Sequence, residues 1–322
     1  MLTDLSEREL WEYRSDVQLP ADFDQFWNET LAEASSHELA LTVEPVDTGL
    51  VTLDVFDVSF AGFGGHRIRG WFSTPTGAKE PLPIVVQYVG YGGGRGAPLD
   101  HLAYASSGYA HLVMDTRGQG SAGSVGSTPD PIGSGPSVSG FLTRGIESRE
   151  NYYYRRLFTD AVRAVDAAKE LPGVDPSRVG IVGGSQGGAI ALAVSALRDD
   201  LTAVVAFVPF LCDMRRASVI TDADPFAEIG RYLATHRQSV DTIFDTLAYF
   251  DGVNMARRAT APVWISAALM DPICPPSTVF GAFHEYTGPK NLKVWPYNHH
   301  EGGGVEDLLI ALRAFREVFA QV

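Results

Sequence analysis

The chain has 322 residues, 45% of them hydrophobic and 20% charged. It therefore has ample material for a large folded core, and intrinsic disorder is excluded. Asp and Glu outnumber Lys and Arg by 39 to 25, giving a formal net charge of −14. A field of that sign repels phosphate backbones and anionic lipid surfaces, so we expect no nucleic-acid or membrane partner. The two cysteines, Cys212 and Cys274, are too few for a disulfide framework or a four-thiolate zinc site. We interpret them as free thiols that pack in the interior.

The N-terminal region shows no sign of a targeting or membrane segment. Its first twenty residues lack a basic start, an apolar run and a small-residue cleavage site, and nowhere do about 18 apolar residues follow one another. We therefore predict a cytoplasmic protein. Ser6 and Glu9 fit the capping box of a first helix, and Asp22 is placed to cap a second. The apolar face of that second helix comprises Phe23, Phe26, Trp27 and Leu31.

A change of hydrophobic period marks the beginning of the sheet. Residues 51–72 alternate around a glycine-rich turn at 62–65, which predicts an antiparallel hairpin. Later apolar runs barely alternate, as is typical of parallel strands buried on both faces. These runs are residues 84–86, 110–114, 178–182, 203–207 and 263–267. Helical patterns at 158–171 and 188–197 lie between some of them, so the sequence predicts an α/β fold with a mostly parallel central sheet.

Two segments depart from this alternation. Residues 120–140 contain six Gly, six Ser and three Pro, which indicates a long loop with a functional or interfacial role. Residues 213–258 are helical in pattern, and we expect this insertion to lie over the sheet as a cap that shapes a pocket. With no break in composition, we predict one domain over 1–322, with a helical N-terminal extension of about 1–50 and the cap-like insertion at about 213–258.

The pentapeptide Gly183-Gly184-Ser185-Gln186-Gly187 matches G-x-S-x-G. It lies between a predicted strand and a predicted helix, which is the setting of a nucleophile elbow. A phosphate-binding loop is the alternative, but it would need a lysine after the glycines and none is present. We therefore predict that Ser185 is a nucleophile.

A serine nucleophile needs a histidine base, and the base needs a carboxylate that orients it. In α/β-hydrolases the acid and then the histidine follow the serine along the chain. His236 and His284 lie in predicted helices, whereas His299 and His300 lie in a loop after a late strand at 292–296. Spacing alone does not decide between these last two neighbours.

Asp271 is the candidate acid because it directly follows the predicted strand that includes 263–267. From there its carboxylate can turn toward the loop that holds the candidate histidines. Asp213, Asp222 and Asp251 are rivals, but they belong to the insertion and do not follow a core strand.

The oxyanion of a tetrahedral intermediate requires two preorganised hydrogen-bond donors. We predict that one is the backbone N–H of Gln186, the residue after the nucleophile. The second is expected from the loop at 89–96, Val-Gly-Tyr-Gly-Gly-Gly-Arg-Gly, where glycines let a ligand approach the backbone closely.

Taken together, the motifs resemble carbohydrate esterase family 7, the acetyl xylan esterases and cephalosporin C deacetylases, over nearly the whole chain. The segments that carry the resemblance are FDQFW at 23–27, VQYVGY at 86–91, DTRGQG at 115–120, TRGI at 143–146, YYYRR at 152–156, GGSQGG at 183–188, MDPICPPST at 270–278 and HE at 300–301. The combination of RGQG, GGSQGG and HE is specific, whereas no single one of them is diagnostic. Gly92 and Pro272 are small departures at which access to the acyl pocket could differ.

The resemblance implies a Ser185–His300–Asp271 triad on an α/β-hydrolase fold, and it selects His300 over His299. It implies that Tyr91 supplies the second oxyanion amide, and that Arg117 and Gln119 are structural. Buried Arg117 would need a carboxylate partner, which the sequence does not name.

The implied activity is that of a serine esterase that removes acetyl groups from acetylated xylo-oligosaccharides, cephalosporin C or similar small esters, with no metal or organic cofactor. The resemblance also implies a homohexamer with its active sites facing an interior cavity. Tyr91, Pro209 and Ile273 are the candidate substrate-binding residues, and Ile273 would limit the length of the acyl chain. The alternatives are a serine peptidase or lactone hydrolase of the same fold and a catalytically silent binding protein.

Overall fold

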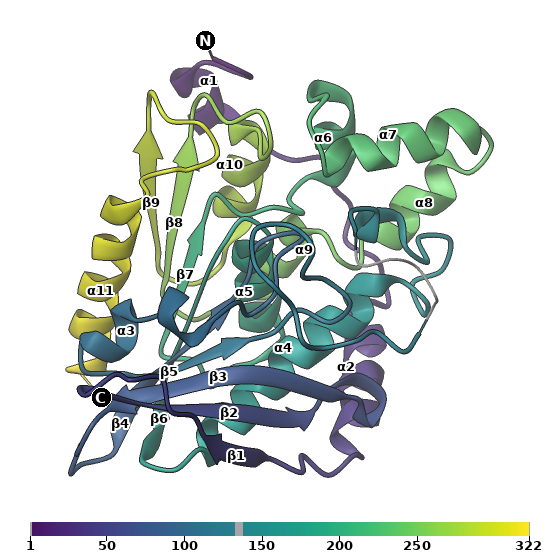
Figure 1. The fold of residues 1–322 in the computed structure, drawn as a ribbon. Coiled ribbons are helices and arrows are strands. Elements are labelled where there is room, and N and C mark those ends of the chain that lie inside the picture. The colour runs from purple at the N-terminus through teal and green to yellow at the C-terminus, as the bar shows by residue number, and fades with distance from the viewer. Residues whose placement is uncertain (1, 133–137, 322) are drawn as a thin grey trace.

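The computed structural model describes residues 2–132 and 138–321, which fold around a nine-stranded sheet (Figure 1). The strand order is β1-β2-β3-β5-β4-β6-β7-β8-β9. Pairing is antiparallel from β1 to β5 and parallel from β5 to β9, which confirms the mostly parallel sheet. The strands are β1 Thr42–Pro45, β2 Leu53–Ala61, β3 Arg67–Pro75, β4 Leu82–Tyr88, β5 Ala110–Met114, β6 Val174–Gly184, β7 Ala203–Phe207, β8 Val263–Ala268 and β9 Lys290–Trp295.

Helices cover both faces of this sheet. The α-helices are α1 Glu7–Glu12, α2 Phe23–Ser35, α3 Ala103–Ser106, α4 Tyr153–Glu170, α5 Gln186–Leu197, α6 Met214–Ile220, α7 Phe226–Thr235, α8 Val240–Leu247, α9 Gly252–Ala256, α10 Pro276–Glu285 and α11 Val305–Phe319. Short 3-10 turns are η1 Phe63–Gly65, η2 Pro98–Asp100 and η3 Phe141–Thr143. The parallel strands are apolar at successive positions because each face has its own core: Ile84 and Val86 join the core that includes α4 and α5, whereas Val85 joins that of α3 and α11.

The N-terminal region combines the two predicted helices with a strand. The Ser6–Glu9 capping box is present, and β2 pairs with β3 in the predicted antiparallel hairpin. The extension is not wholly helical, because β1 pairs with β2 at the edge of the sheet. The prediction that Asp22 caps α2 through its side chain is wrong. Its carboxylate instead accepts hydrogen bonds from Arg149 and from the Tyr249 hydroxyl.

The insertion at 213–258 divides into two parts. Helices α6, α7 and α8 stand beside the sheet at the right of Figure 1, whereas α9 packs against α5 and α10 in the layer over the sheet. In the glycine-rich segment 120–140, residues 133–137 lie outside the described residues. The amides of Gly120, Ser121 and Ala122 all donate to the carbonyl oxygen of Gly92, at 3.0–3.1 Å, so the beginning of this segment is built into the loop after β4. Within the described ranges, no helix is long and apolar enough to cross a membrane.

Candidate active site

Ser185 stands at the junction between β6 and α5 in a strained backbone conformation. Its φ of 55° and ψ of −119° lie where a residue with a side chain is rarely found. The turn is held by hydrogen bonds from the Ser185 amide to the Phe207 carbonyl at 2.9 Å and from the Phe210 amide to the Ser185 carbonyl at 3.0 Å. This strand–turn–helix geometry presents the half-buried hydroxyl at the N-terminus of α5.

Close backbone contacts explain two glycines of the pentapeptide. A Cβ at Gly183 would lie 2.2 Å from the backbone of Gly187, and a Cβ at Gly187 would lie 2.3 Å from the carbonyl oxygen of Tyr88. Gly184 has no such neighbour closer than 4.0 Å. Glycine is therefore required at the two outer positions of G-x-S-x-G, and the variable second position is free of this constraint.

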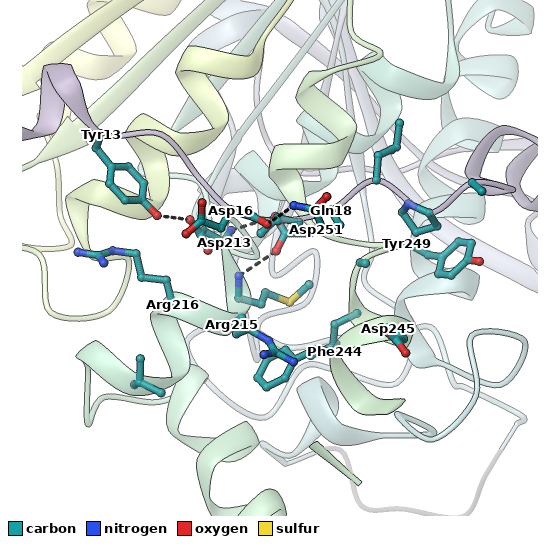
Figure 2. A pocket seen from close by; sticks show the side chains of 18 residues that line it. Tyr13, Asp16, Gln18, Asp213, Arg215, Arg216, Phe244, Asp245, Tyr249 and Asp251 are labelled. Atoms are coloured by element: carbon teal, nitrogen blue, oxygen red, sulfur yellow. Dashed lines mark hydrogen bonds between the residues drawn. The ribbon is translucent and has the colours of Figure 1, made fainter. Parts of the chain in front are cut away.

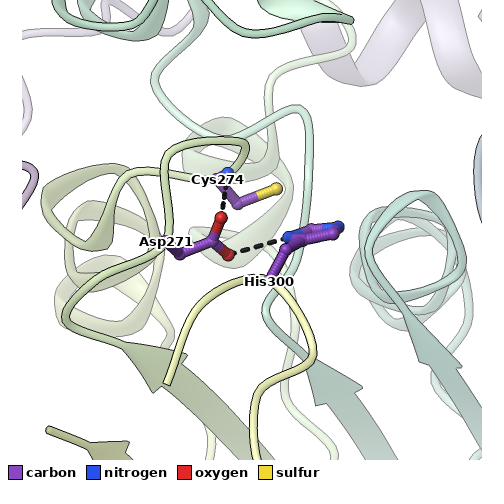
Figure 3. A group of neighbouring side chains, drawn as sticks. All are labelled: Asp271, Cys274 and His300. Atoms are coloured by element: carbon purple, nitrogen blue, oxygen red, sulfur yellow. Dashed lines mark hydrogen bonds and ion pairs between the residues drawn. The ribbon is translucent and has the colours of Figure 1, made fainter. Parts of the chain in front are cut away.

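The structure brings Ser185, His300 and Asp271 together from three separate loops at the carboxyl ends of β6, β9 and β8. The Ser185 hydroxyl lies 2.9 Å from His300 Nε2, and His300 Nδ1 lies 2.8 Å from Asp271 Oδ2. Figure 3 shows the second of these contacts, with the imidazole edge facing the carboxylate. In the tautomer that fits this chain, Nδ1–H donates to Asp271 and Nε2 accepts the serine proton.

Asp271 is fully buried and held by its own loop. Its Oδ1 accepts the amides of Ile273 at 2.8 Å and Cys274 at 3.0 Å, which leaves Oδ2 for the histidine. The imidazole is accordingly held at both nitrogens before any substrate arrives. Such preorganisation is what a general base requires.

The rival histidines have other partners. The exposed His299 donates its amide to Glu301, His236 stacks on Tyr232 with ring centroids 4.0 Å apart, and the His284 ring lies 3.1 Å from the Leu10 carbonyl oxygen. None of these rings contacts Ser185 in the described residues. Geometry thus separates His300 from His299, which spacing could not do.

The rival acids lie elsewhere. Asp222 is exposed, and Asp213 and Asp251 line a cavity of about 1020 Å³ between residues 13–21 and helices α6 and α8. Figure 2 shows Tyr13 pointing at Asp213 with Arg216 beside it. No triad residue lines this cavity.

Each predicted oxyanion donor has a backbone amide in a segment that adjoins the elbow. Gln186 is the first residue of α5, so its amide has no acceptor within the helix. Tyr91 follows β4, the strand next to β6, and its amide makes no hydrogen bond within the part of the chain that the structure describes. The positive end of the α5 dipole adds to the attraction of this region for negative charge.

Gln119 of the RGQG motif connects the two donor segments. Its Oε1 accepts the Gly92 amide at 2.7 Å, and its Nε2 lies 3.0 Å from Oε1 of Gln186. The Gln186 side chain in turn donates to the Val89 carbonyl at 3.3 Å. These contacts hold the loop after β4 against the elbow, which is the structural role that the resemblance implied.

Arg117 finds the carboxylate that the sequence did not name. It forms a buried bidentate pair with Asp160 of α4, at 2.5 and 2.6 Å, and lies 3.4 Å from Asp130. Asp160 also accepts the amide of Phe63 at 2.9 Å. The pair joins the segment that follows β5 to α4 and η1.

Glu228 is a residue near the site that sequence reasoning missed. It belongs to α7, is 6% exposed, and accepts the Tyr91 hydroxyl at 2.7 Å. It also accepts the amides of Gly140 at 3.0 Å and Leu142 at 3.2 Å. Burial raises the pKa of Glu228. A helix of the insertion therefore holds the loop that carries Tyr91. In the sequence, the signal for this contact was an acidic residue within a helical pattern that has a buried face. Tyr91 and Glu228 are 137 residues apart in the chain.

The other predicted substrate-binding residues also lie beside the site. Pro209 is buried close to Gly188, where an added Cβ would meet it at 3.1 Å, and Ile273 is half-buried two residues after Asp271. The Tyr91 ring packs edge-on against Phe210, with centroids 6.0 Å apart. Pro209 thus lies next to the helix that follows the elbow, and Ile273 lies in the loop that carries the acid.

Comparison with known proteins gives a matching family model and several similar solved structures. The family model described as acetyl xylan esterase (AXE1) matches residues 1–309. The solved acetyl xylan esterase from Paenibacillus sp. R4 is 34% identical, with a TM-score of 0.91 over 98% of this chain and 100% of that one. Acetyl xylan esterase 1 from Thermoanaerobacterium sp. JW/SL YS485 is 31% identical, with a TM-score of 0.89 over 98% and 99% of the two chains.

Among curated proteins, acetyl esterase Axe7A of Xylanibacter ruminicola is 32% identical over 290 residues. The match covers 87% of this chain and 63% of the length of that relative. The predicted α/β-hydrolase fold is confirmed by the structural matches. On the family model and these relatives, the chain belongs to the acetyl xylan esterase family.

Proposed function

We propose that this protein is a serine esterase that removes acetyl groups from acetylated xylo-oligosaccharides or similar small acetyl esters. The observation that carries the proposal is the continuous hydrogen-bonded chain from Ser185 through His300 to Asp271. Family membership supports the same class of reaction. The names of two relatives specify acetyl xylan esters, and the name of the third specifies acetyl esters.

In the proposed mechanism, His300 Nε2 takes the proton of Ser185 as the oxygen attacks the acetyl carbonyl carbon. The amides of Gln186 and Tyr91 donate to the oxyanion that forms. His300 then gives the proton to the departing sugar oxygen, which leaves an acetyl-serine. Water, deprotonated by His300, attacks that ester and releases acetate. Asp271 stabilises the imidazolium during both halves of the reaction.

A narrow acyl site is part of the proposal. Ile273 beside the acid and Pro209 beside the elbow, together with the Tyr91 ring, would leave room for acetyl and exclude long acyl chains. Equal turnover of acetyl and octanoyl esters would refute this point. Cephalosporin C, which carries an acetyl ester, is a further candidate substrate, and its hydrolysis is to be measured as well.

The decisive experiment compares hydrolysis of p-nitrophenyl acetate and octanoate by the wild type and by Ser185→Ala. We expect acetate turnover to fall by about 10⁶-fold in the variant, because removing the nucleophile of a triad has an effect of that order. Activity that survives the substitution would withdraw the triad. Cleavage of aminoacyl amides at rates similar to acetyl esters would favour a peptidase, and inactivity of the folded wild type would favour a silent binding protein.

The predicted hexamer and cytoplasmic location stay proposals. A closed ring with interior active sites would exclude polymeric xylan and favour oligosaccharides. Sedimentation velocity tests the assembly directly, because a monomer and a hexamer of this chain differ sixfold in mass. A monomer at working concentration would refute the ring.

A further inference from the structure

A third side chain lies beside the acid and the base of the proposed triad. Asp271, Cys274 and His300 each offer one donor atom, and these atoms all lie within 4.8 Å of one another (Figure 3). Cys274 is 1% exposed and stands in the loop between β8 and α10. The backbone amide of Cys274 donates a hydrogen bond to Asp271 Oδ1 at 3.0 Å, so the turn that holds the acid also holds the residue that carries the thiol. The proposed hydrolysis makes no use of this sulfur.

The donor set fits one class of ligand. A thiolate, an imidazole and a carboxylate together are typical ligands of Zn²⁺, whereas Mg²⁺ and Ca²⁺ prefer oxygen alone. With zinc bonds of about 2.0 to 2.3 Å, tetrahedral ligand atoms lie roughly 3.3 to 3.7 Å apart. The three donors would therefore have to close by no more than roughly 1.5 Å.

His300 is the member of the cluster that can make this movement. Its side chain is 25% exposed, whereas that of Asp271 is fully buried. The loop that carries it continues into Gly302, Gly303 and Gly304, and two of these glycines have positive φ. The loop after it is held by hydrogen bonds from the Gly302 amide to the His299 carbonyl at 3.1 Å and from the Gly303 amide to Asp307 at 2.8 Å, so rotation of the imidazole is the smallest movement that closes the cluster. The partly exposed ring is also the side chain of the cluster that a cation from solvent reaches first.

Both imidazole nitrogens are already in use, which determines the consequence of binding. Nδ1 faces Asp271 and Nε2 faces Ser185. A metal at Nε2 would take the lone pair that accepts the serine proton, and a metal at Nδ1 would break the contact with the acid. In either arrangement the base is lost. As the Zn–S bond forms, the thiol proton leaves to water, so no oxidant or reductant is needed.

We propose that Cys274, His300 and Asp271 form a binding site for a thiophilic divalent cation, with Zn²⁺ as the best fit, and that its occupation reversibly inhibits the enzyme. The inhibition rests on the proposed esterase function, but the binding does not. Zinc in this site is an inhibitor and takes no part in hydrolysis. The net charge of −14 favours the approach of cations to the protein as a whole.

The binding test uses Co²⁺ as a spectroscopic substitute for zinc. We expect the wild-type protein to develop a thiolate-to-cobalt absorption band that added Zn²⁺ abolishes. Cys274→Ser and His300→Ala should lose the band. Cys212→Ser is the matched control, because Cys212 is the other cysteine and is equally buried, and it should keep the band. Circular dichroism verifies that each variant is folded. A wild type without the band, or a Cys274→Ser protein that retains it, would overturn the site.

The inhibition test measures hydrolysis of p-nitrophenyl acetate against Zn²⁺ in buffer without chelator, each variant relative to its own rate without metal. We expect EDTA to restore the wild-type rate. In Cys274→Ala the half-inhibitory concentration should rise by about tenfold or more, whereas in Cys212→Ser it should stay unchanged. Equal inhibition of wild type and Cys274→Ala would refute the proposal. If the wild type proved inactive on esters, the cobalt spectra would still decide whether the site exists.

Discussion

Two buried carboxylates, Asp271 and Asp251, both accept the backbone amide two residues further along the chain, but their other partners differ. Asp271 accepts two amides of its own loop and one imidazole nitrogen. Asp251 accepts the amides of Asp213, Met214 and Val253, all at 2.8–2.9 Å, and its charged neighbour is the Asp213 carboxylate. Burial raises the pKa of Asp251 to about 7, and Asp213 adds to the rise. An acid facing a base orients it for chemistry, whereas an acid facing another acid is driven toward its neutral form.

The comparison extends to two more acids. Asp160 faces the guanidinium of Arg117, and Glu228 faces the hydroxyl of Tyr91. All four carboxylates are buried, and each holds segments that are far apart in the sequence. The nature of the partner decides whether the acid serves reaction, stability or the placement of a loop. Substituting each one in turn therefore tests the comparison.

Asp271→Asn should have the largest effect. The amide removes the negative charge and favours the wrong imidazole tautomer, so we expect kcat for p-nitrophenyl acetate to fall by about 10⁴-fold. Steady-state kinetics measures the loss, and circular dichroism verifies the fold. Asp251→Asn is the matched control, since it changes an equally buried acid outside the site. A loss of kcat of similar size in both variants would erase the distinction between the two acids.

Asp160→Asn should act on stability. It removes the bidentate carboxylate partner of the fully buried Arg117 and leaves Asp130, 3.4 Å away, in its place, so we expect the free energy of unfolding to fall by about 3 kcal/mol. Urea denaturation measures this change. Glu33→Gln is the control, because it removes an ion pair between Arg155 and a largely exposed carboxylate and should cost at most about 1 kcal/mol. Equal losses of unfolding free energy in the two variants would show that burial of an ion pair has no effect on its contribution to stability.

Glu228→Gln and Tyr91→Phe should each lower kcat by about tenfold, because a hydrogen bond to a charged group is lost or weakened at the loop that carries the Tyr91 amide. Tyr91→Phe retains that amide and removes only the hydroxyl. Since the two groups contact each other, the double variant should lose little more than either single one. Fully additive losses would mean that Glu228 does not act through Tyr91.

Asp251→Asn should change the pH dependence of stability. The native-state pKa of about 7 lies above the ordinary 3.8, so between these values the folded protein binds the proton more tightly than the unfolded chain. The contribution of this group to stability is complete at low pH and is lost as pH rises toward 7. The difference between wild-type and variant free energies of unfolding should decline by up to about 1.4 kcal/mol per pH unit between pH 5 and 6.5. Urea denaturation across that range tests this, and a difference independent of pH would contradict it.

Much of the site could be predicted because its signals are local. The predicted strand at 178–182, Ser185 and the glycines that permit the tight turn are neighbours in the sequence, and chain order then restricts the acid and the histidine. Residue spacing could not separate His299 from His300, because adjacent residues in a loop have no periodicity that assigns them a direction. The family resemblance made that selection, and the geometry agrees with it.

The interpretation of Asp22 shows where local rules are insufficient. A cap of its own helix was the sound local expectation, but Arg149 and Tyr249 compete for the carboxylate and prevail. The partners of Arg117 and Tyr91, Asp160 and Glu228, are likewise distant in sequence. No pattern of period or turn chemistry encodes such a pairing.

What the sequence by itself determined is the order of elements, the elbow and the class of chemistry, because hydrophobic period and turn residues act over a few positions. The tertiary structure alone decided which carboxylates meet a guanidinium, a hydroxyl or another acid. It also placed the Cys274 thiol beside His300. The physical reason is that these energies depend on distance and burial between groups, and both are properties of the folded chain.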